Sequence, residues 1–160
     1  EEQYDNSIFN DIYWAQDKKL LGTAQAIPVY RARKGQQPVA AVFTPVAPDG
    51  YNGSIRLLVG VYYQGTLAGV RVISHQETPG LGDKIERQRS DWILTFSGRS
   101  LTDPPLSQWK VKRDGGVFDQ FTGATITPRA VVNAVKNTLL FFRQYRQELF
   151  AKNIPKTPQD

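Results

Sequence analysis

Small and hydroxyl-bearing side chains gather in the stretch Asp119-Gln-Phe-Thr122-Gly-Ala-Thr125, directly before a segment with the apolar periodicity of a long helix. The amide groups that begin a helix have no partners inside it and together carry about half a positive charge. Glycine and alanine let a ligand approach the backbone closely, and the hydroxyls of Thr122, Thr125 and Thr127 can add hydrogen bonds. Such a set suits a phosphate group. A capped helix start without a ligand fits the same residues, and the missing Gly-Lys-Ser/Thr excludes a Walker loop.

A second stretch, residues 75–86 (HQETPGLGDKIE), combines a bent backbone with polar and apolar side chains. Its proline and two glycines predict an exposed bend after a strand. A planar ligand could be held between the side chain of Leu81 and backbone amides of this bend. A plain connection between a strand and a helix would also explain the pattern. The candidate binding residues here are Glu77, Thr78, Gly80, Leu81 and Gly82.

The remaining polar residues offer little catalytic chemistry. With one histidine and no cysteine, the chain has no Ser-His-Asp or Cys-His set, no thiolate-held iron–sulfur cluster and no disulfide. We expect His75 to be a half-exposed strand residue, and residues 49–55 (DGYNGSI) to form a turn that needs no ligand. We therefore expect no catalytic residue and no metal site, and any chemistry would come from a cofactor.

Length and charge narrow the class of protein further. The 160 residues fit one domain, 1–160, with a real core. The net charge of +5 suits an anionic ligand or a membrane surface, but the basic residues are scattered, so we expect no nucleic-acid partner. No apolar run is long enough to span a membrane. Since the sequence contains no Met, we expect a processed or truncated chain whose N-terminal signal or anchor is missing.

The pattern of elements predicts an α+β fold, an antiparallel sheet flanked by helices. An amphipathic pattern over 1–22 predicts a partly helical segment that ends at Gly22. Gln64-Gly65 is a tight-hairpin signal, because glycine readily adopts a positive φ. Strands are predicted at 26–33, 39–46, 54–63, 66–74 and 109–112, a helix in the later part of 76–96, and loop at 97–108.

The last predicted element is an amphipathic helix over 128–150, with apolar residues recurring at the helical period. Thr127 is the predicted N-cap and Pro128 the first helical residue, positions that both residue types favour. The tail 151–160 is predicted to be flexible.

Together, the two stretches resemble the FMN-binding domain of the G subunit of the Rnf electron-transport complex, also called Rsx. The chain is similar, more distantly, to the C subunit of the sodium-translocating NADH:quinone oxidoreductase. The pattern Asp-x-x-Ser/Thr-Gly-Ala-Thr is the flavinylation motif of this family, and here it is paired with Glu-Thr-Pro-Gly-Leu-Gly upstream. The resemblance covers nearly the whole chain.

The resemblance implies that Thr125 carries FMN through a phosphoester bond to its hydroxyl. In the family a separate flavin transferase makes this bond from FAD with a divalent metal and releases AMP. At position 122 this sequence has Thr where the family more commonly has Ser, and Thr keeps the hydroxyl. By the same resemblance, transferase recognition and phosphate placement fall to Asp119, Thr122, Gly123 and Ala124, and the flavin ring is held by Glu77, Thr78, Gly80, Leu81 and Gly82. Thr127 is a further cofactor-binding candidate because of its hydroxyl at the helix start.

The resemblance also implies partners and a location. We expect a redox subunit, not a free-standing enzyme, that works with the other subunits of an Rnf-type complex. Its FMN-binding domain would face the periplasm from the bacterial inner membrane, held there by an N-terminal helix missing from this sequence. Two alternatives remain open: a flavin- or phosphate-binding sensory module without electron flow, and a structural interaction domain with Thr125 unmodified.

Overall fold

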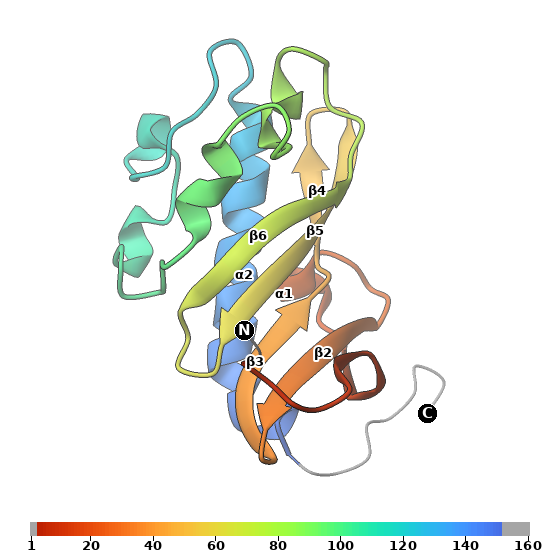
Figure 1. The fold of residues 1–160 in the computed structure, drawn as a ribbon. Coiled ribbons are helices and arrows are strands. Elements are labelled where there is room, and N and C mark those ends of the chain that lie inside the picture. Colours follow the sequence, from red (N-terminus) through yellow and green to blue (C-terminus); the bar gives the residue numbers. More distant parts are fainter. Residues whose placement is uncertain (1–2, 152–160) are drawn as a thin grey trace.

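The computed structural model describes residues 3–151, in which an antiparallel sheet packs against a long helix, α2 (Ile126–Leu149) (Figure 1). The predicted α+β class is therefore confirmed. Of the predicted tail 151–160, all but Ala151 lies outside the described residues. The strands are β1 (Ile12–Ala15), β2 (Ile27–Lys34), β3 (Gln37–Phe43), β4 (Val46–Gly50), β5 (Gly53–Tyr62) and β6 (Leu67–Ser74). The short helices are α1 (Lys18–Leu21) and the 3-10 turns η1 (Ile8–Asn10), η2 (Gly82–Ile85), η3 (Trp92–Phe96), η4 (Leu106–Gln108) and η5 (Lys112–Asp114).

Strand β5 is the centre of the sheet. The strand order is β1-β2-β3-β5-β4, and β6 pairs with β5 as well. Along β5 every second side chain is buried, as expected for a strand with one face on the core. Each of these four side chains is completely buried: Ile55, Leu57, Val59 and Val61.

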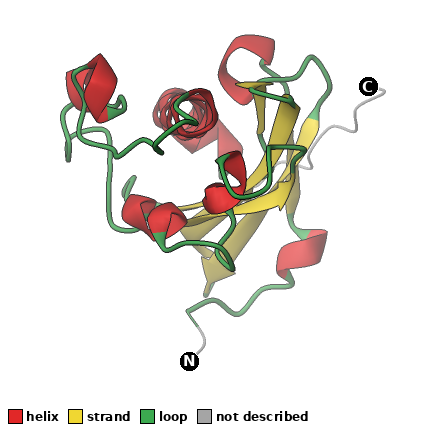
Figure 2. Ribbon diagram, turned by 90° about the horizontal axis from the view of Figure 1, so that it is seen from above, coloured by secondary structure: helices red, strands yellow, loops and turns green. Residues whose placement is uncertain are grey.

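Helix α2 covers the buried face of the sheet. Its apolar stripe includes Val131, Val135 and Leu139, and burying such side chains contributes about 1.5–3 kcal/mol each. Phe43 of β3 packs edge to face against two α2 rings, with centroids 6.0 Å and 6.3 Å away. Viewed nearly along its axis, α2 has the sheet on one side and the loops and short helices of residues 75–125 on another (Figure 2).

An aromatic cluster within residues 75–125 extends the hydrophobic core of the domain. The ring centroids of Trp92 and Phe121 lie 5.2 Å apart, and those of Trp109 and Phe118 lie 4.9 Å apart. The indole N–H of Trp92 donates a hydrogen bond of 3.0 Å to the carbonyl of Asp119. The aromatic cluster therefore fixes the backbone at Asp119, the first residue of the Asp119–Thr125 stretch.

Several predicted elements differ from the structure. The amphipathic pattern in 1–22 is divided among η1, strand β1, which pairs with β2, and the single turn α1, so the segment is helical only in part. Gly22 does end that turn, in the left-handed conformation. The strand predicted at 39–46 is divided into β3 and β4. The predicted helix within 76–96 consists of 3-10 turns, and the strand predicted at 109–112 is reduced to an isolated bridge between Val111 and Phe118.

The start of α2 also differs from its prediction. The helix begins at Ile126 with Thr125 as the N-cap, so Thr127 lies inside the first turn. Thr127 is not the cap because its hydroxyl donates to the carboxylate of Glu77 instead. Pro128 occupies the third helical position, which costs no hydrogen bond, since the first four amides of a helix have no acceptor within it.

The opposite end of α2 is held by an ion-pair cluster in which Arg31 is buried and Asp11 and Arg33 are half-buried. The carboxylate of Asp11 contacts Arg31 at 2.6 Å and Arg33 at 2.9 Å. Arg31 also donates to the carbonyl of Leu149 at 2.9 Å, and Arg33 to that of Phe150 at 3.3 Å. Burial raises the pKa of Asp11, but hydrogen bonds and charge from Arg33 and Arg31 outweigh burial, so this pKa lies below its ordinary value.

We expect Asp11→Asn to lower the free energy of unfolding at pH 7 by about 2 kcal/mol, because charged hydrogen bonds to both arginines are lost. A lowered pKa stabilises the folded chain above the unfolded-state pKa of about 3.9, and this contribution disappears as the pH falls through the folded-state pKa. The fall in stability below about pH 4 should thus be shallower in the variant.

Urea unfolding across this pH range measures both effects. The exposed Asp49, which lies on β4, provides the control Asp49→Asn. Equal stability losses in the two variants would contradict a stabilising role for the ion-pair cluster.

Candidate functional site

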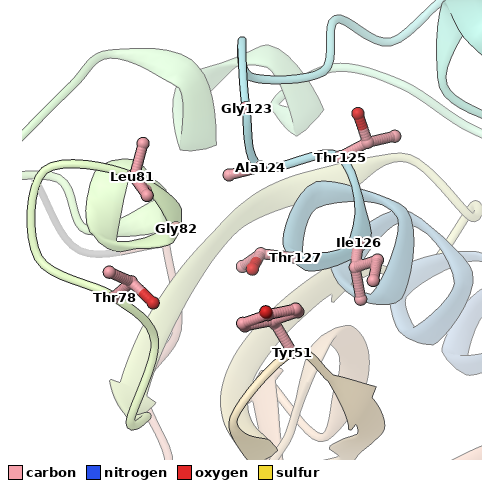
Figure 3. A pocket seen from close by; sticks show the side chains of 9 residues that line it. All are labelled: Tyr51, Thr78, Leu81, Gly82, Gly123, Ala124, Thr125, Ile126 and Thr127. Atoms are coloured by element: carbon pink, nitrogen blue, oxygen red, sulfur yellow. The ribbon is translucent and has the colours of Figure 1, made fainter.

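The two stretches singled out in the sequence meet at one cavity of about 340 Å³ (Figure 3). It lies between the β4–β5 turn, the loop before η2 and the start of α2. A Cβ atom built on Gly123 would lie 3.7 Å from Cδ2 of Leu81, so the flavinylation motif and the upstream loop are in direct reach of each other. The lining residues are Tyr51, Thr78, Leu81, Gly82, Gly123, Ala124, Thr125, Ile126 and Thr127.

Thr125 lies at the point where the motif turns into the helix. Gly123 has a φ of 78°, a left-handed conformation that favours glycine, and the chain enters α2 two residues later. Within the described part of the chain, the Thr125 side chain makes no capping hydrogen bond, although this residue is the N-cap. Its hydroxyl points away from Thr127 and Tyr51 (Figure 3). Thr125 therefore presents a half-buried hydroxyl that stabilises no neighbouring group.

The positive charge at this helix start comes from the backbone. The amides of Ile126 and Thr127 are in the first turn, where no intrahelical acceptor exists. The nearby cation, Arg129, is already paired with Asp114 through bonds of 2.7 Å and 3.0 Å. This bond and the positive charge of Arg129 hold the pKa of Asp114 below its ordinary value. The backbone amides are thus the available partners for an anion at this end of the cavity.

Glu77 is buried behind the cavity and joins three segments. Its Oε1 accepts from the amide of Tyr51 and its Oε2 from the amide of Asn52, both at 2.9 Å. The hydroxyl of Thr127 also donates to Oε1. A buried carboxylate is tolerated only where donors compensate its lost hydration, and Glu77 has three. Glu77 does not line the cavity, and its carboxylate binds the Tyr51 and Asn52 amides and the Thr127 hydroxyl instead.

The loop after Glu77 is fitted closely to the helix start. The side-chain amide of Asn52 donates to Thr78 Oγ1 at 3.1 Å. A Cβ on Gly82 would lie 2.7 Å from Thr127 Oγ1, so a larger residue has no room there. Gly80 adopts a φ of 77°, and its amide donates to Asp83 Oδ1 at 2.9 Å, outside the cavity lining.

Two further sequence candidates, Asp119 and Thr122, do not line the cavity, and neither does His75, for which no role was expected. Asp119 is exposed and pairs with Lys112 at 2.7 Å. Thr122 is exposed on the same loop. His75 follows the end of β6, is half-buried, and contacts Glu86 Oε2 at 2.5 Å while its Nδ1 accepts from the Glu77 amide at 2.9 Å.

Sequence reasoning missed Tyr51. Residues 49–55 were assigned to a turn that needs no ligand, but this turn places the ring of Tyr51 in the cavity wall. The available signal was a large aromatic side chain between the glycines of the β4–β5 turn. Ile126 was missed for a related reason, since the helix begins earlier than its apolar pattern indicates.

No helix among residues 3–151 combines the length and apolar character needed to cross a membrane. In the same residues, no three His, Cys, Asp or Glu side chains are grouped so that they could hold a metal ion.

The fold and the cavity define an FMN-binding domain, and residues 50–140 match the family described as "FMN-binding domain". The chain is 52% identical over 149 residues to the G subunit of the ion-translocating oxidoreductase complex of Vibrio atlanticus, covering 93% of this chain and 71% of that one. It is 51% identical over 152 residues to the corresponding protein of Shewanella oneidensis, covering 95% and 72%. The chain therefore belongs to the family of G subunits of the ion-translocating oxidoreductase complex, as the resemblance predicted.

The crystal structure of Shewanella oneidensis NqrC shares the fold. It aligns with a TM-score of 0.57 and 24% identity, covering 84% of this chain and 70% of that chain.

We expect Glu77→Gln to lower the free energy of unfolding by about 1–3 kcal/mol, because the new NH₂ group must face one of the two amides and leaves it unpaired. Chemical denaturation measures the loss. Asp91→Asn is the control: it removes a carboxylate whose ion pair with Arg87 is solvent-exposed, so the change should stay below about 0.5 kcal/mol. If Glu77→Gln were as stable as this control, Glu77 would not be holding the site together.

Proposed function

We propose that this chain carries FMN covalently, through a phosphoester bond to Thr125, and passes electrons within an ion-translocating membrane complex. The observation that carries the proposal is the meeting of the flavinylation motif and the upstream loop at one cavity, with an uncommitted Thr125 hydroxyl at its edge. The names of the relatives, subunits of an ion-translocating oxidoreductase complex, support the redox role.

The residues around the cavity fit the two ends of FMN. The cavity volume of about 340 Å³ is within the range of small-molecule sites. The helix-start amides of Ile126 and Thr127 suit the phosphate, and Gly123 allows its close approach. Leu81 and Tyr51 provide apolar and aromatic surface for the ring. When bound, the flavin supplies one- or two-electron transfer, and these residues would hold it and limit its contact with water.

Attachment at Thr125 requires a group transfer but no change of oxidation state. The Thr125 oxygen forms a bond to the phosphorus on the FMN side of FAD, and the bond from that phosphorus to the bridging oxygen breaks. AMP leaves with the bridging oxygen, and the hydroxyl proton passes to a base. We assign the base and the divalent metal to a separate flavin transferase, as the family resemblance implies. In this chain the exposed carboxylate of Asp119 is accessible to such an enzyme.

The remaining parts of the proposal concern the assembly. The domain would be anchored in the bacterial inner membrane by a segment that precedes this sequence, and would face the periplasm. Its electron donor and acceptor would be other subunits of the complex. Membership in this family favours a redox role over a sensory module, and reduction of the bound flavin through partner subunits would distinguish the two.

We expect co-expression with a flavin transferase to add one FMN, less one water, to the chain, and Thr125→Ala to abolish this addition. Because Thr125 makes no capping bond, its loss should change the free energy of unfolding by only about 1 kcal/mol or less. Intact mass spectrometry and peptide mapping measure the addition. Thr125→Ser, which keeps the hydroxyl, is the matched control and should still be labelled. Flavin found on Thr122 or Thr127 would show that the acceptor is misassigned.

We expect Asp119→Ala to slow flavinylation while the Thr125 hydroxyl remains in place. The carboxylate is exposed and six residues from the acceptor, so it can contact the transferase or the metal that the transferase holds. The rate of mass increase measures the effect. Lys112→Ala is the control, because it removes the ion pair and leaves the carboxylate. A normal labelling rate for Asp119→Ala would show that Asp119 is an ordinary loop residue without a role in flavinylation.

A further inference from the structure

We propose that a second cavity, near the end of α2, binds a phosphate group. This distal cavity has a volume of about 320 Å³ and lies between the β5–β6 hairpin turn, the loop before η4 and the later half of α2 (Figure 1). From Thr125 to Arg143 the helix extends about 27 Å, at about 1.5 Å per residue. The distal cavity shares no lining residue with the cavity at the start of α2 and is independent of the function proposed for it.

The distal cavity brings together two guanidinium groups without a carboxylate. Arg143 and Arg146 both line it and are one turn apart, so they lie on the same side of α2. Among the described residues that form its lining there is no Asp or Glu, and Asp103, which follows the lining residue Thr102 in sequence, is not one of them. Two neighbouring cations repel each other, and an anion bound between them would relieve that repulsion.

The two arginines differ in what they already bind. Arg146 donates to the carbonyl of Tyr63 at 3.2 Å, and its guanidinium carbon lies 4.8 Å from the centroid of the Tyr63 ring. Arg146 therefore ties the hairpin to the helix. Arg143 is exposed, and within the described part of the chain its side chain forms no hydrogen bond and no ion pair. Its fork of N–H donors is available to a ligand.

Hydroxyl groups supply further donors around the same cavity. Thr66 comes from the hairpin, and Ser100 and Thr102 come from the loop before η4. The hydroxyl oxygens of Ser100 and Thr102 lie 3.1 Å apart. The indole N–H of the buried Trp109 donates to the Ser100 carbonyl at 2.9 Å, which fixes this wall from the core side. The donors are thus held in place before a ligand arrives, which lowers the cost of binding.

The kind and number of donors favour a phosphate group. Arginine forks match the geometry of phosphate oxygens, and a phosphate has more oxygens than a carboxylate to accept the additional hydroxyl donors. The buried side chains of Leu139 and Phe142 form an apolar part of the lining, so the body that carries the phosphate can be apolar. A soluble phosphate compound and the headgroup of an acidic lipid both have this chemistry.

Titration with inorganic phosphate at constant ionic strength, followed by NMR, tests the site. The amide signals of residues 64–66 and 100–102 should shift together and reach saturation. Arg143→Gln should raise the Kd for phosphate about tenfold, the usual effect of losing a hydrogen bond from a charged group. Thr102→Val keeps every charge and should raise Kd about threefold, as expected for a neutral hydrogen bond.

Arg56→Gln is the matched control. Arg56 is exposed on β5 and does not line the distal cavity, so its replacement removes the same charge and should leave the Kd for phosphate unchanged. If Arg56→Gln weakened binding as much as Arg143→Gln, phosphate would be responding to net charge alone, and the site would be overturned. Unchanged binding in Arg143→Gln would overturn it as well.

Flotation with lipid vesicles identifies the source of the phosphate group. Binding to phosphatidylglycerol vesicles, absent with phosphatidylcholine vesicles and lost in Arg143→Gln, would support the site and assign it to a lipid headgroup. Arg143-dependent binding of inorganic phosphate without vesicle binding would support it as a site for a soluble phosphate compound. A chain that binds neither probe in a manner that depends on Arg143 would overturn the inference.

Discussion

The site depends on one buried carboxylate. Glu77 receives hydrogen bonds from two amides of the β4–β5 turn and from the hydroxyl of Thr127 in the first turn of α2. These segments are distant in sequence, and no other described side chain bonds to all three groups. Because an ionised group in the interior requires its donors, the carboxylate enforces the relative positions of the turn, the loop and the helix. Gly82 adds to this constraint, since any side chain there would separate the loop from Thr127.

Helix α2 is fixed at both ends by charged groups that differ in kind. At its start the contact is the Glu77 carboxylate, and at its end the guanidinium groups of Arg31 and Arg33 donate to the last carbonyls. The positively charged arginines lie at the negative end of the helix dipole, where they are favourable. At the positive end, Glu77 accepts a hydrogen bond from a side chain and leaves the first amides of the helix available. The positive end of the helix therefore remains directed at the cavity.

The sequence was most informative where local chemistry determines structure. The glycine hairpin at Gln64-Gly65 and the amphipathic pattern of α2 were predicted correctly, and the two motifs singled out by residue type and spacing meet at the cavity. In the N-terminal segment the partial helix and its end at Gly22 were predicted, but strand β1 was not, because its pairing with β2 is a contact that no local pattern reveals. Thr127 was misjudged for a similar reason, since its partner Glu77 lies 50 residues away.

Tyr51 shows the same limit within the site itself. Its turn is ordinary when considered alone, and only the position of Glu77 and the loop after it turns the ring into part of a cavity wall. The residue types of this segment could predict a turn. They could not predict that the Tyr51 ring lines a cavity, because that depends on the folded chain. The assignment of FMN to the chain, by contrast, followed from motifs that can be read without the fold.

The Thr125 side chain makes no capping hydrogen bond at the start of α2, and this separates folding from maturation. A group joined to that oxygen would displace no contact on which the helix start depends. If Thr125 is the attachment point, as proposed, loading is a step that a folded domain can undergo, and the size of a reserve of unloaded protein would depend on the transferase as well as on the supply of flavin.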